Sequence, residues 1–236
     1  MGGLQREGDV MNEDWRIRHG GVIEDFVHTL NESSQDYVLK GGTALYLCYG
    51  LDRFSEDIDL DGRAKGMAAL VERFCQDRGY TFRVAKDTDT VERCMVNYGN
   101  AEKPLKIEVS YRRKKIDEAE TETVGGILVY KIEPLCIMKV NAYTHRDKIR
   151  DLYDVTFICG RYYDQLSPQA VALLRSAVEY KGIEQFDYIM QNQRDELIDN
   201  DKQSVDFLNM YDRLGLLADR DEPDEDEDES QGMNMQ

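Results

Sequence analysis

Residues 40–61 read KGGTALYLCYGLDRFSEDIDLD, and the first part of this stretch predicts a turn into a helix. Gly41 and Gly42 follow a short apolar run at 37–39, and Thr43 precedes the apolar letters ALYL. Paired glycines let the backbone approach a bound group closely and point amide N–H groups at an anion, while Thr43 can cap the helix. A Gly-Gly turn before a helix is also common as plain chain punctuation, so it does not establish a site by itself.

The second part of the same stretch, at Asp57 to Leu60, alternates acids and aliphatic residues. On a strand, Asp57 and Asp59 point to one side while Ile58 and Leu60 face a core. Two parallel carboxylates repel each other, and hard oxygen ligands at this spacing suit Mg²⁺ or Mn²⁺. A solvated acidic edge strand is the alternative, although the two aliphatic residues require one buried face. Asp61 is expected to be a spare surface acid.

A third carboxylate lies in the segment KIEVSY, where Glu108 sits between aliphatic residues and shares a face with Lys106 and Ser110. If this strand lies beside that of Asp57, three carboxylates can hold two metal ions. An ordinary outward-facing glutamate is the alternative. The surrounding cations, interleaved with Tyr111, predict either a patch for RNA phosphates or a solvated strand end. These cations are Lys103, Lys106, Arg112, Arg113, Lys114 and Lys115.

Hydrophobic periodicity predicts an α+β chain. Further strands are expected at 80–84, 93–98, 105–111 and 127–130. Helices are expected at 14–31, 44–50, 66–78, 134–146, 149–161, 168–180, 183–190 and 203–215. This order predicts an N-terminal sheet domain over 1–130 and a C-terminal helical domain over 131–217.

Two pairs of charged residues in the second half also share helical faces. Lys139 and Arg146 are seven residues apart, so a helix would place both on one face. If that face turns toward the carboxylates, the two cations could hold a triphosphate. Asp151 and Asp154 share a face of the next helix. Asp154 could orient Lys139 or Arg146, or the acids could form a structural ion-pair network between the two helices.

The order of Gly-Gly turn, helix, acid-x-acid strand and later acid resembles the nucleotidyltransferase superfamily that includes DNA polymerase β, with Thr43 where serine is commoner. The wording of residues 40–61 is similar, more specifically, to the AbiEii/AbiGii toxin family, which shows Gly-Gly-Thr-Ala-Leu and then Arg-Phe-Ser-x-Asp-x-Asp-Leu. That family also carries a helical Lys…Arg motif and an Arg-Asp-Leu-Tyr-Asp motif. Lys139, Arg146 and the segment 150–155 match these two motifs, and the likeness runs in order from about residue 37 to 158.

This resemblance implies a polymerase β-like mixed sheet with helices, followed by a helical domain. It implies a metal-dependent nucleotidyltransferase that uses an NTP, with GTP or a pyrimidine triphosphate as donor, tRNA or another RNA as acceptor, and Mg²⁺ or Mn²⁺ as cofactor. It also implies a toxin of a bacterial toxin–antitoxin or phage-defence system, with a cognate antitoxin as partner. The implied catalytic residues are Asp57, Asp59 and Glu108, which also bind metal, together with Lys139 and Asp154. The implied nucleotide-binding residues are Lys40, Gly41, Gly42, Thr43, Arg53, Ser55 and Arg146.

The charge balance limits the class of protein. Lys+Arg 30 against Asp+Glu 47 gives a net charge of −17, which argues against a protein that coats nucleic acid but leaves a local basic groove open. Residues 219–229 hold nine of these acids, so 218–236 is predicted to be a disordered, solvated acidic tail. The alternative to an enzyme is an NTP-binding regulatory or partner protein without transfer activity. The negative charge favours that alternative, and the complete set of three acids favours the enzyme.

Cysteine usage and hydropathy predict a cytoplasmic protein. No apolar run approaches the roughly 18 residues of a membrane span, and the first residues lack the order of a secretion signal, so no membrane partner is expected. Met11 is an alternative start. The cysteines are scattered without a C-x-x-C spacing, as expected of reduced thiols. They are Cys48, Cys75, Cys94, Cys136 and Cys159.

Overall fold

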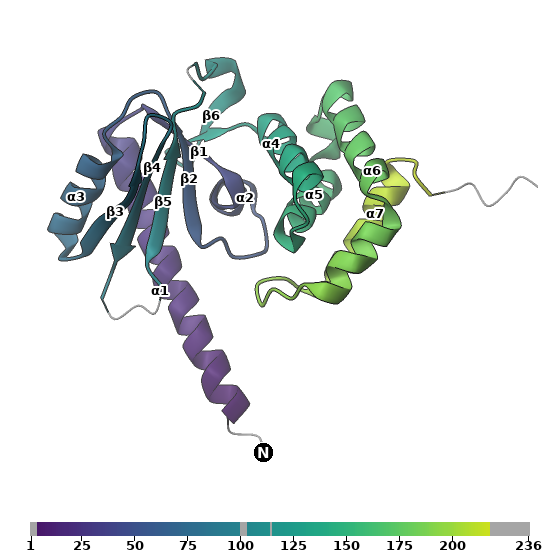
Figure 1. Ribbon diagram of the computed structural model, residues 1–236, viewed down its shortest axis with the longest axis horizontal. Coiled ribbons are helices and arrows are strands. Elements are labelled where there is room, and N and C mark those ends of the chain that lie inside the picture. The colour runs from purple at the N-terminus through teal and green to yellow at the C-terminus, as the bar shows by residue number, and fades with distance from the viewer. Residues whose placement is uncertain (1–3, 100–102, 114, 218–236) are drawn as a thin grey trace, which may run out of the picture.

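The computed structural model describes residues 4–99, 103–113 and 115–217, with side chains from residue 15 onward. A mixed sheet with flanking helices forms the first part, and a group of helices packs beside it (Figure 1). The α+β fold class is therefore confirmed. The predicted acidic tail at 218–236 lies outside the described residues. The alternative start at Met11 falls where the side chains are not described.

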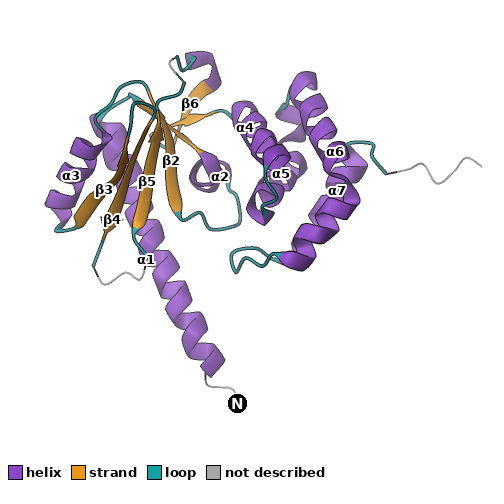
Figure 2. Cartoon of the chain, viewed as in Figure 1, coloured by secondary structure: helices purple, strands orange, loops and turns teal. Residues whose placement is uncertain are grey.

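Seven strands form one sheet in the order β3-β4-β5-β2-β1-β7-β6 (Figure 2). Strands β2 and β5, and likewise β1 and β7, pair in parallel, whereas the other neighbours are antiparallel. The bounds are β1 Tyr37–Lys40, β2 Asp57–Gly62, β3 Thr81–Asp87, β4 Val91–Asn97, β5 Leu105–Ser110, β6 Thr121–Val124 and β7 Ile127–Tyr130. Strand β6 was not predicted, because TETV lacks an apolar face and joins β7 through a turn at Gly125 and Gly126, both with positive φ.

Seven α-helices are found in the part of the chain that the structure describes. Their bounds are α1 Leu4–Ser33, α2 Gly41–Tyr49, α3 Met67–Arg78, α4 Ile132–His145, α5 Ile149–Tyr162, α6 Pro168–Asn192 and α7 Asn200–Arg213. Helix α6 joins the two helices predicted at 168–180 and 183–190, with a kink at Gly182, where φ is 71°. Helix α2 begins at Gly41 with Lys40 as its N-cap, so the prediction of Thr43 as N-cap was wrong.

One hydrophobic core runs through the sheet and both groups of helices. Ile58 and Leu60 are buried as the alternation predicts, together with Phe26 of α1 and Phe74 of α3, whose rings meet edge to face with centroids 5.0 Å apart. Helices α1 and α3 lie together against the sheet (Figure 1). The polar face of β2 is thereby left to the opposite side, where the acids lie. No described helix is long and apolar enough to cross a membrane.

A substitution at Gly62, the last residue of β2, tests how closely the sheet is packed. A Cβ atom at Gly62 would lie 2.5 Å from Cε1 of Tyr111 and 2.8 Å from Cγ1 of Val109. We expect Gly62→Ala to lower the free energy of unfolding by about 1–3 kcal/mol, because a well-packed core resists added atoms. Urea unfolding measures the change.

Gly21→Ala is the matched control, since nothing lies within 4 Å of its Cβ position in the helix α1. Alanine is the better helix former, so this variant should gain roughly 0.5–1 kcal/mol. Equal effects of the two substitutions would contradict the packing described at Gly62.

Candidate active site

The Gly-Gly turn packs directly against the acidic strand. Strands β1 and β2 pair with Lys40 opposite Asp59, so the turn that follows β1 lies beside that aspartate. Gly41 has a φ of 77°, and a Cβ atom there would lie 3.0 Å from Oδ2 of Asp59. A Cβ atom at Gly42 would lie 2.9 Å from Oγ of Ser55. A side chain at Gly41 would be strained by the positive φ and would press on Asp59, and a side chain at Gly42 would displace Ser55.

Thr43 is part of the framework of the turn. Its side chain is buried, with 1% exposure, and its hydroxyl donates to Oγ of Ser55 at 2.8 Å and also contacts the carbonyl oxygen of Asp57. The hydroxyl thus ties the start of α2 to the loop before β2. It does not reach the cleft, so its expected contact with a phosphate is replaced by a positioning role, whereas Ser55 does line the cleft.

Lys40 is likewise held within the fold. Its ammonium pairs with the carboxylate of Asp61, which also accepts a hydrogen bond from the Tyr130 hydroxyl at 2.9 Å. Asp61 is only 4% exposed, so the expectation of a spare surface acid was wrong. The alternation of β2 places Asp61 on the same face as Asp59, but deeper in the sheet, where it needs a cation and a hydroxyl to be stable.

The two acids of β2 line an open cleft, and the third predicted acid lies on the neighbouring strand. Strands β2 and β5 pair in parallel with Asp59 opposite Glu108, as the sequence predicts. The carboxylate of Glu108 turns to Arg93 at 2.5 Å, and Lys106 pairs with Asp57 at 2.7 Å. The expected three-carboxylate cluster is therefore not assembled: no group of three acidic, His or Cys ligands that could hold a metal occurs among the described residues.

The surroundings of Asp59 disfavour the charged form of its carboxyl. Burial raises the pKa of its carboxyl above the ordinary value, and the charges of Asp57 and Glu108 act in the same direction. Lys106 and Lys139 oppose this shift. Since Asp57 and Asp59 present hard oxygen atoms to one cleft, this pair fits a divalent cation, and Glu108 lies directly opposite Asp59 on the neighbouring strand.

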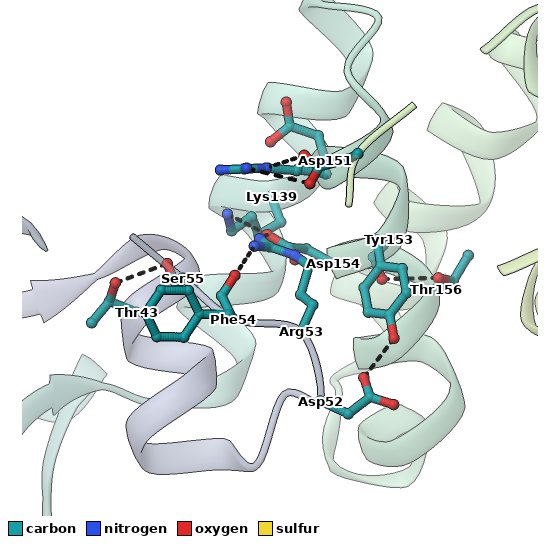
Figure 3. A network of polar contacts seen from close by, with 12 residues as sticks. Thr43, Asp52, Arg53, Phe54, Ser55, Lys139, Asp151, Tyr153, Asp154 and Thr156 are labelled. Atoms are coloured by element: carbon teal, nitrogen blue, oxygen red, sulfur yellow. Dashed lines mark hydrogen bonds and ion pairs between the residues drawn. The ribbon is translucent and has the colours of Figure 1, made fainter. Parts of the chain in front are cut away.

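A buried carboxylate joins the loop before β2 to the helices α4 and α5 (Figure 3). Asp154 of α5 is fully buried and accepts two hydrogen bonds from Arg53, both at 2.8 Å, in the loop before β2. The ammonium of Lys139 in α4 lies 2.5 Å from the same carboxylate. Asp154 thus orients Lys139, as expected, and also Arg53.

Arg146 does not share this network. Helix α4 ends at His145, so Arg146 leaves the helical face on which the sequence placed it with Lys139. Its guanidinium donates to Asp151 at 2.6 and 2.9 Å instead. It nevertheless lines the cleft, on the side of the helices and not of the sheet.

The cleft has a volume of ≈ 810 Å³ and lies between the start of β2 and the helices α4, α5 and α6. The predicted site residues that line it are Gly42, Arg53, Ser55, Asp57, Asp59, Lys139 and Arg146. The predicted residues that do not line it are Lys40, Gly41, Thr43, Glu108 and Asp154. The side chains or backbone of the first group can touch a ligand directly, and Lys40, Thr43 and Asp154 of the second group hold neighbouring residues in place.

Sequence reasoning missed the contact that closes one side of the cleft. Arg150 of α5 donates to Glu56 at 3.0 Å and pairs with Asp195 in the loop after α6. Glu56 also binds Lys103 at 2.6 Å. Arg150 opens the matched Arg-Asp-Leu-Tyr-Asp motif and Glu56 stands in the acidic motif, but no sequence signal points to Asp195.

The predicted basic patch around the Glu108 strand is divided. Lys103 and Lys106 pair with acids at the cleft end of β5, whereas Arg113 pairs with Glu120 beyond the other end of the strand. A strand of six residues separates the two groups by about 20 Å. Lys114 lies outside the described residues.

Comparison with known proteins places the chain in a family. The family described as "Nucleotidyl transferase AbiEii toxin, Type IV TA system" matches residues 27–228. The chain belongs to the AbiEii nucleotidyltransferase toxin family. The Gly-Gly turn, the acid pair and the Asp154 network all fall within the matched part, and no match was found among curated proteins.

Two solved structures share the fold described above, and a third matches with a lower score. The structure of JHP933 from Helicobacter pylori has a TM-score of 0.71 and 28% identity, covering 85% of this chain and 93% of its own. A second Helicobacter pylori structure has a TM-score of 0.69 and 28% identity, covering 85% and 95%. MenT4, a nucleotidyltransferase toxin from Mycobacterium tuberculosis, has a TM-score of 0.49 and 18% identity, covering 85% and 83%.

The Asp154 network predicts that loss of one carboxylate charge strongly destabilises the fold. We expect Asp154→Asn to lower the free energy of unfolding by about 3–5 kcal/mol, because Arg53 and Lys139 then share no buried anion. Asp151→Asn is the control: its partner Arg146 has 58% side-chain exposure and stays solvated. Urea unfolding should show a much smaller loss for the control, and equal losses would contradict the network.

The Arg150 contacts predict a dependence of stability on pH. Burial raises the pKa of Glu56, but the hydrogen bonds and charges of Lys103 and Arg150 outweigh it and leave the pKa below the ordinary 4.5. The pKa of Asp195 is likewise lowered, because the hydrogen bonds from Arg150 and from Leu197 N–H outweigh burial. Both acids therefore stabilise the fold above their unfolded pKa values and lose this contribution as pH falls through the folded values.

We expect the wild type to lose stability as the pH falls below about 4.5, and Arg150→Gln to show a shallower loss in that range while being less stable near neutral pH. Urea unfolding over this pH series measures both slopes. Arg175→Gln, at an exposed position of α6, is the control and should follow the wild type. An unchanged slope in Arg150→Gln would show that its ion pairs do not stabilise the fold.

Proposed function

We propose that this AbiEii family member transfers a nucleotide from an NTP to a hydroxyl of tRNA or another RNA, with Mg²⁺ or Mn²⁺ as cofactor. The observation that carries the proposal is the placement of Asp57 and Asp59 beside the Gly-Gly turn, at the edge of a cleft whose other walls bear cations. An acid pair facing cations suits a substrate that combines phosphates with a divalent ion.

Asp57 and Asp59 would hold the metal, with Glu108 joining them by leaving Arg93. A bound divalent ion supplies charge neutralisation at the phosphates and lowers the pKa of an attacking hydroxyl. The close packing of Gly41 against Asp59, and of Gly42 against Ser55 of the cleft, brings the first amide N–H groups of α2 to the same place. We assign these amides to the β- and γ-phosphates.

The cations that face the acids would bind the rest of the triphosphate. Arg53 and Lys139 share one carboxylate, so one positive charge in this group is left for a ligand. In the transfer, the acceptor oxygen forms a bond to the α-phosphorus as the bond to the bridging oxygen breaks, and pyrophosphate leaves in line. The chain supplies positioning and electrostatic stabilisation, which dominate such reactions.

Two exposed cations at the cleft suit an RNA acceptor. Lys148 and Arg194 line the cleft, and neither has an ion-pair partner among the residues that the structure describes. Contacts from these residues to phosphates would attract RNA locally although the chain as a whole carries a charge of −17.

In the cell, we place this activity in the cytoplasm, as the toxin of a toxin–antitoxin or phage-defence system with a cognate antitoxin. The family supports the toxin assignment. The free state of all five cysteines fits a reducing compartment.

The second candidate is a nucleotide-binding protein without transfer activity. It is favoured by the ion pairs of Asp57 with Lys106 and of Glu108 with Arg93, which keep the three acids apart. Binding of a nucleotide by the cations alone does not require these acids to converge.

Incubation of the purified chain with each α-³²P-labelled NTP, Mg²⁺ or Mn²⁺ and total RNA separates the two candidates. We expect labelled RNA with at least one NTP, and a loss of about 100-fold or more in Asp59→Asn, since the reaction depends on charge placed at the phosphates. Asp87→Asn is the control, because Asp87 lies at the exposed end of β3 and pairs with Lys65. NTP binding without label on RNA or protein would favour the second candidate, and label at the mass of the protein would indicate self-modification.

A further inference from the structure

We propose that Tyr188 is the stacking platform on which the cleft receives a nucleobase; this inference rests on the proposed binding of nucleotides there. Tyr188 lies in α6 beyond the kink at Gly182, and it lines the same cleft as Asp57 and Asp59. It is 56% exposed, and its ring and hydroxyl have no partner among the described residues. An aromatic side chain left unpaired in a polar cleft offers a surface for a planar ligand.

The wall that carries Tyr188 is pinned to the rest of the site. The side chain of Gln193 accepts from the Ile149 N–H at 3.0 Å and donates to the carbonyl oxygen of Asp147 at 2.6 Å. Asp195, two residues further on, pairs with Arg150. The end of α6 is thus fixed against the start of α5, so the exposed ring sits on a held backbone rather than on a free loop.

The charged and polar residues of the cleft can bind the phosphates of a nucleotide, but they offer no partner for its base. Nearly all the other side chains that line it are charged or polar, and Ile149 is the other sizeable apolar one. Cations and the Gly-Gly turn suit the phosphates, whereas a nucleobase has an apolar π face that polar groups do not match. Stacking of a base on an aromatic ring tolerates every base, so the assignment is to a nucleobase as a class.

The aromatic residues on the other side of the loop before β2 already contact other residues of the fold. They line a second hollow of ≈ 670 Å³. The ring of Phe54 meets those of Trp15 and Tyr46 with centroids 5.8 and 5.7 Å apart. The hydroxyl of Tyr153 donates to Asp52 at 2.7 Å. These rings are packed into the fold, which leaves Tyr188 as the platform.

The base can belong to the donor NTP or to the end of the acceptor RNA, and steady-state labelling with the full chain distinguishes them. One arm varies the NTP at fixed RNA, and the other varies the RNA at fixed NTP. We expect Tyr188→Ala to raise KM in one arm by about 5- to 150-fold, the range for loss of one stacked base, with little change in kcat. Tyr188→Phe keeps the ring and should retain KM near the wild-type value.

Tyr180→Ala is the matched control, because Tyr180 lies on the same helix and is 78% exposed but does not line the cleft. It should leave both KM values unchanged. Wild-type KM values in both arms for Tyr188→Ala, or an equal loss in Tyr188→Phe, would overturn the stacking role while leaving the proposed transfer intact.

If the wild type transfers no label, the proposed transfer fails, and equilibrium dialysis with labelled NTP and with a short labelled RNA decides the inference separately. Weaker binding by Tyr188→Ala than by Tyr180→Ala supports the platform. Unchanged binding, or no binding of either probe by the wild type, overturns it.

Discussion

The buried ion pairs of Asp154 are the interaction on which the site depends. One carboxylate with no exposure pairs with both Arg53 from the loop before β2 and Lys139 from α4, so it joins the sheet to two helices at a single point. Charges buried this deeply are tolerated only when paired and hydrogen-bonded, and the bidentate contact with Arg53 satisfies that condition. The same contact sets the position of the loop that leads into Asp57 and Asp59. The geometry of the acids and that of the cations facing them are therefore coupled.

A second constraint is the close approach of the Gly-Gly turn to the acid strand. Gly41 leaves no room for a side chain between α2 and Asp59 of β2, Gly42 packs as closely against Ser55 in the loop before β2, and the buried hydroxyl of Thr43 holds the turn in place. Neighbouring residues of one motif thus have different roles, some at the cleft and some in the framework behind it. Gly42 meets the cleft, whereas Thr43 and Lys40 hold the backbone and the deeper Asp61 in place.

Local and overall charge differ in this protein. The chain carries −17, yet the cleft wall opposite the acids is formed by side chains such as Arg146, Lys148 and Arg194. Screening limits the reach of distant surface charges to about 10 Å in ordinary salt, so nearby cations govern what enters the cleft. The cations, the Gly-Gly turn and the unpaired ring of Tyr188 lie in one cleft, where the proposed nucleotide would place its phosphates and its base.

The sequence by itself determined the local features: the α+β class, the alternation that puts Asp57 and Asp59 on one face, the glycine pair, and the family to which these motifs belong. Each depends on neighbours within one strand or one helix, where periodicity and backbone preference act directly. Only the tertiary structure decided that Asp61 is buried, that Arg146 pairs with Asp151, and that Glu108 turns to Arg93. It alone brought the end of α6 to the cleft. These contacts join residues far apart in the chain, and their partners follow from packing and charge neutralisation in three dimensions, which no local pattern records.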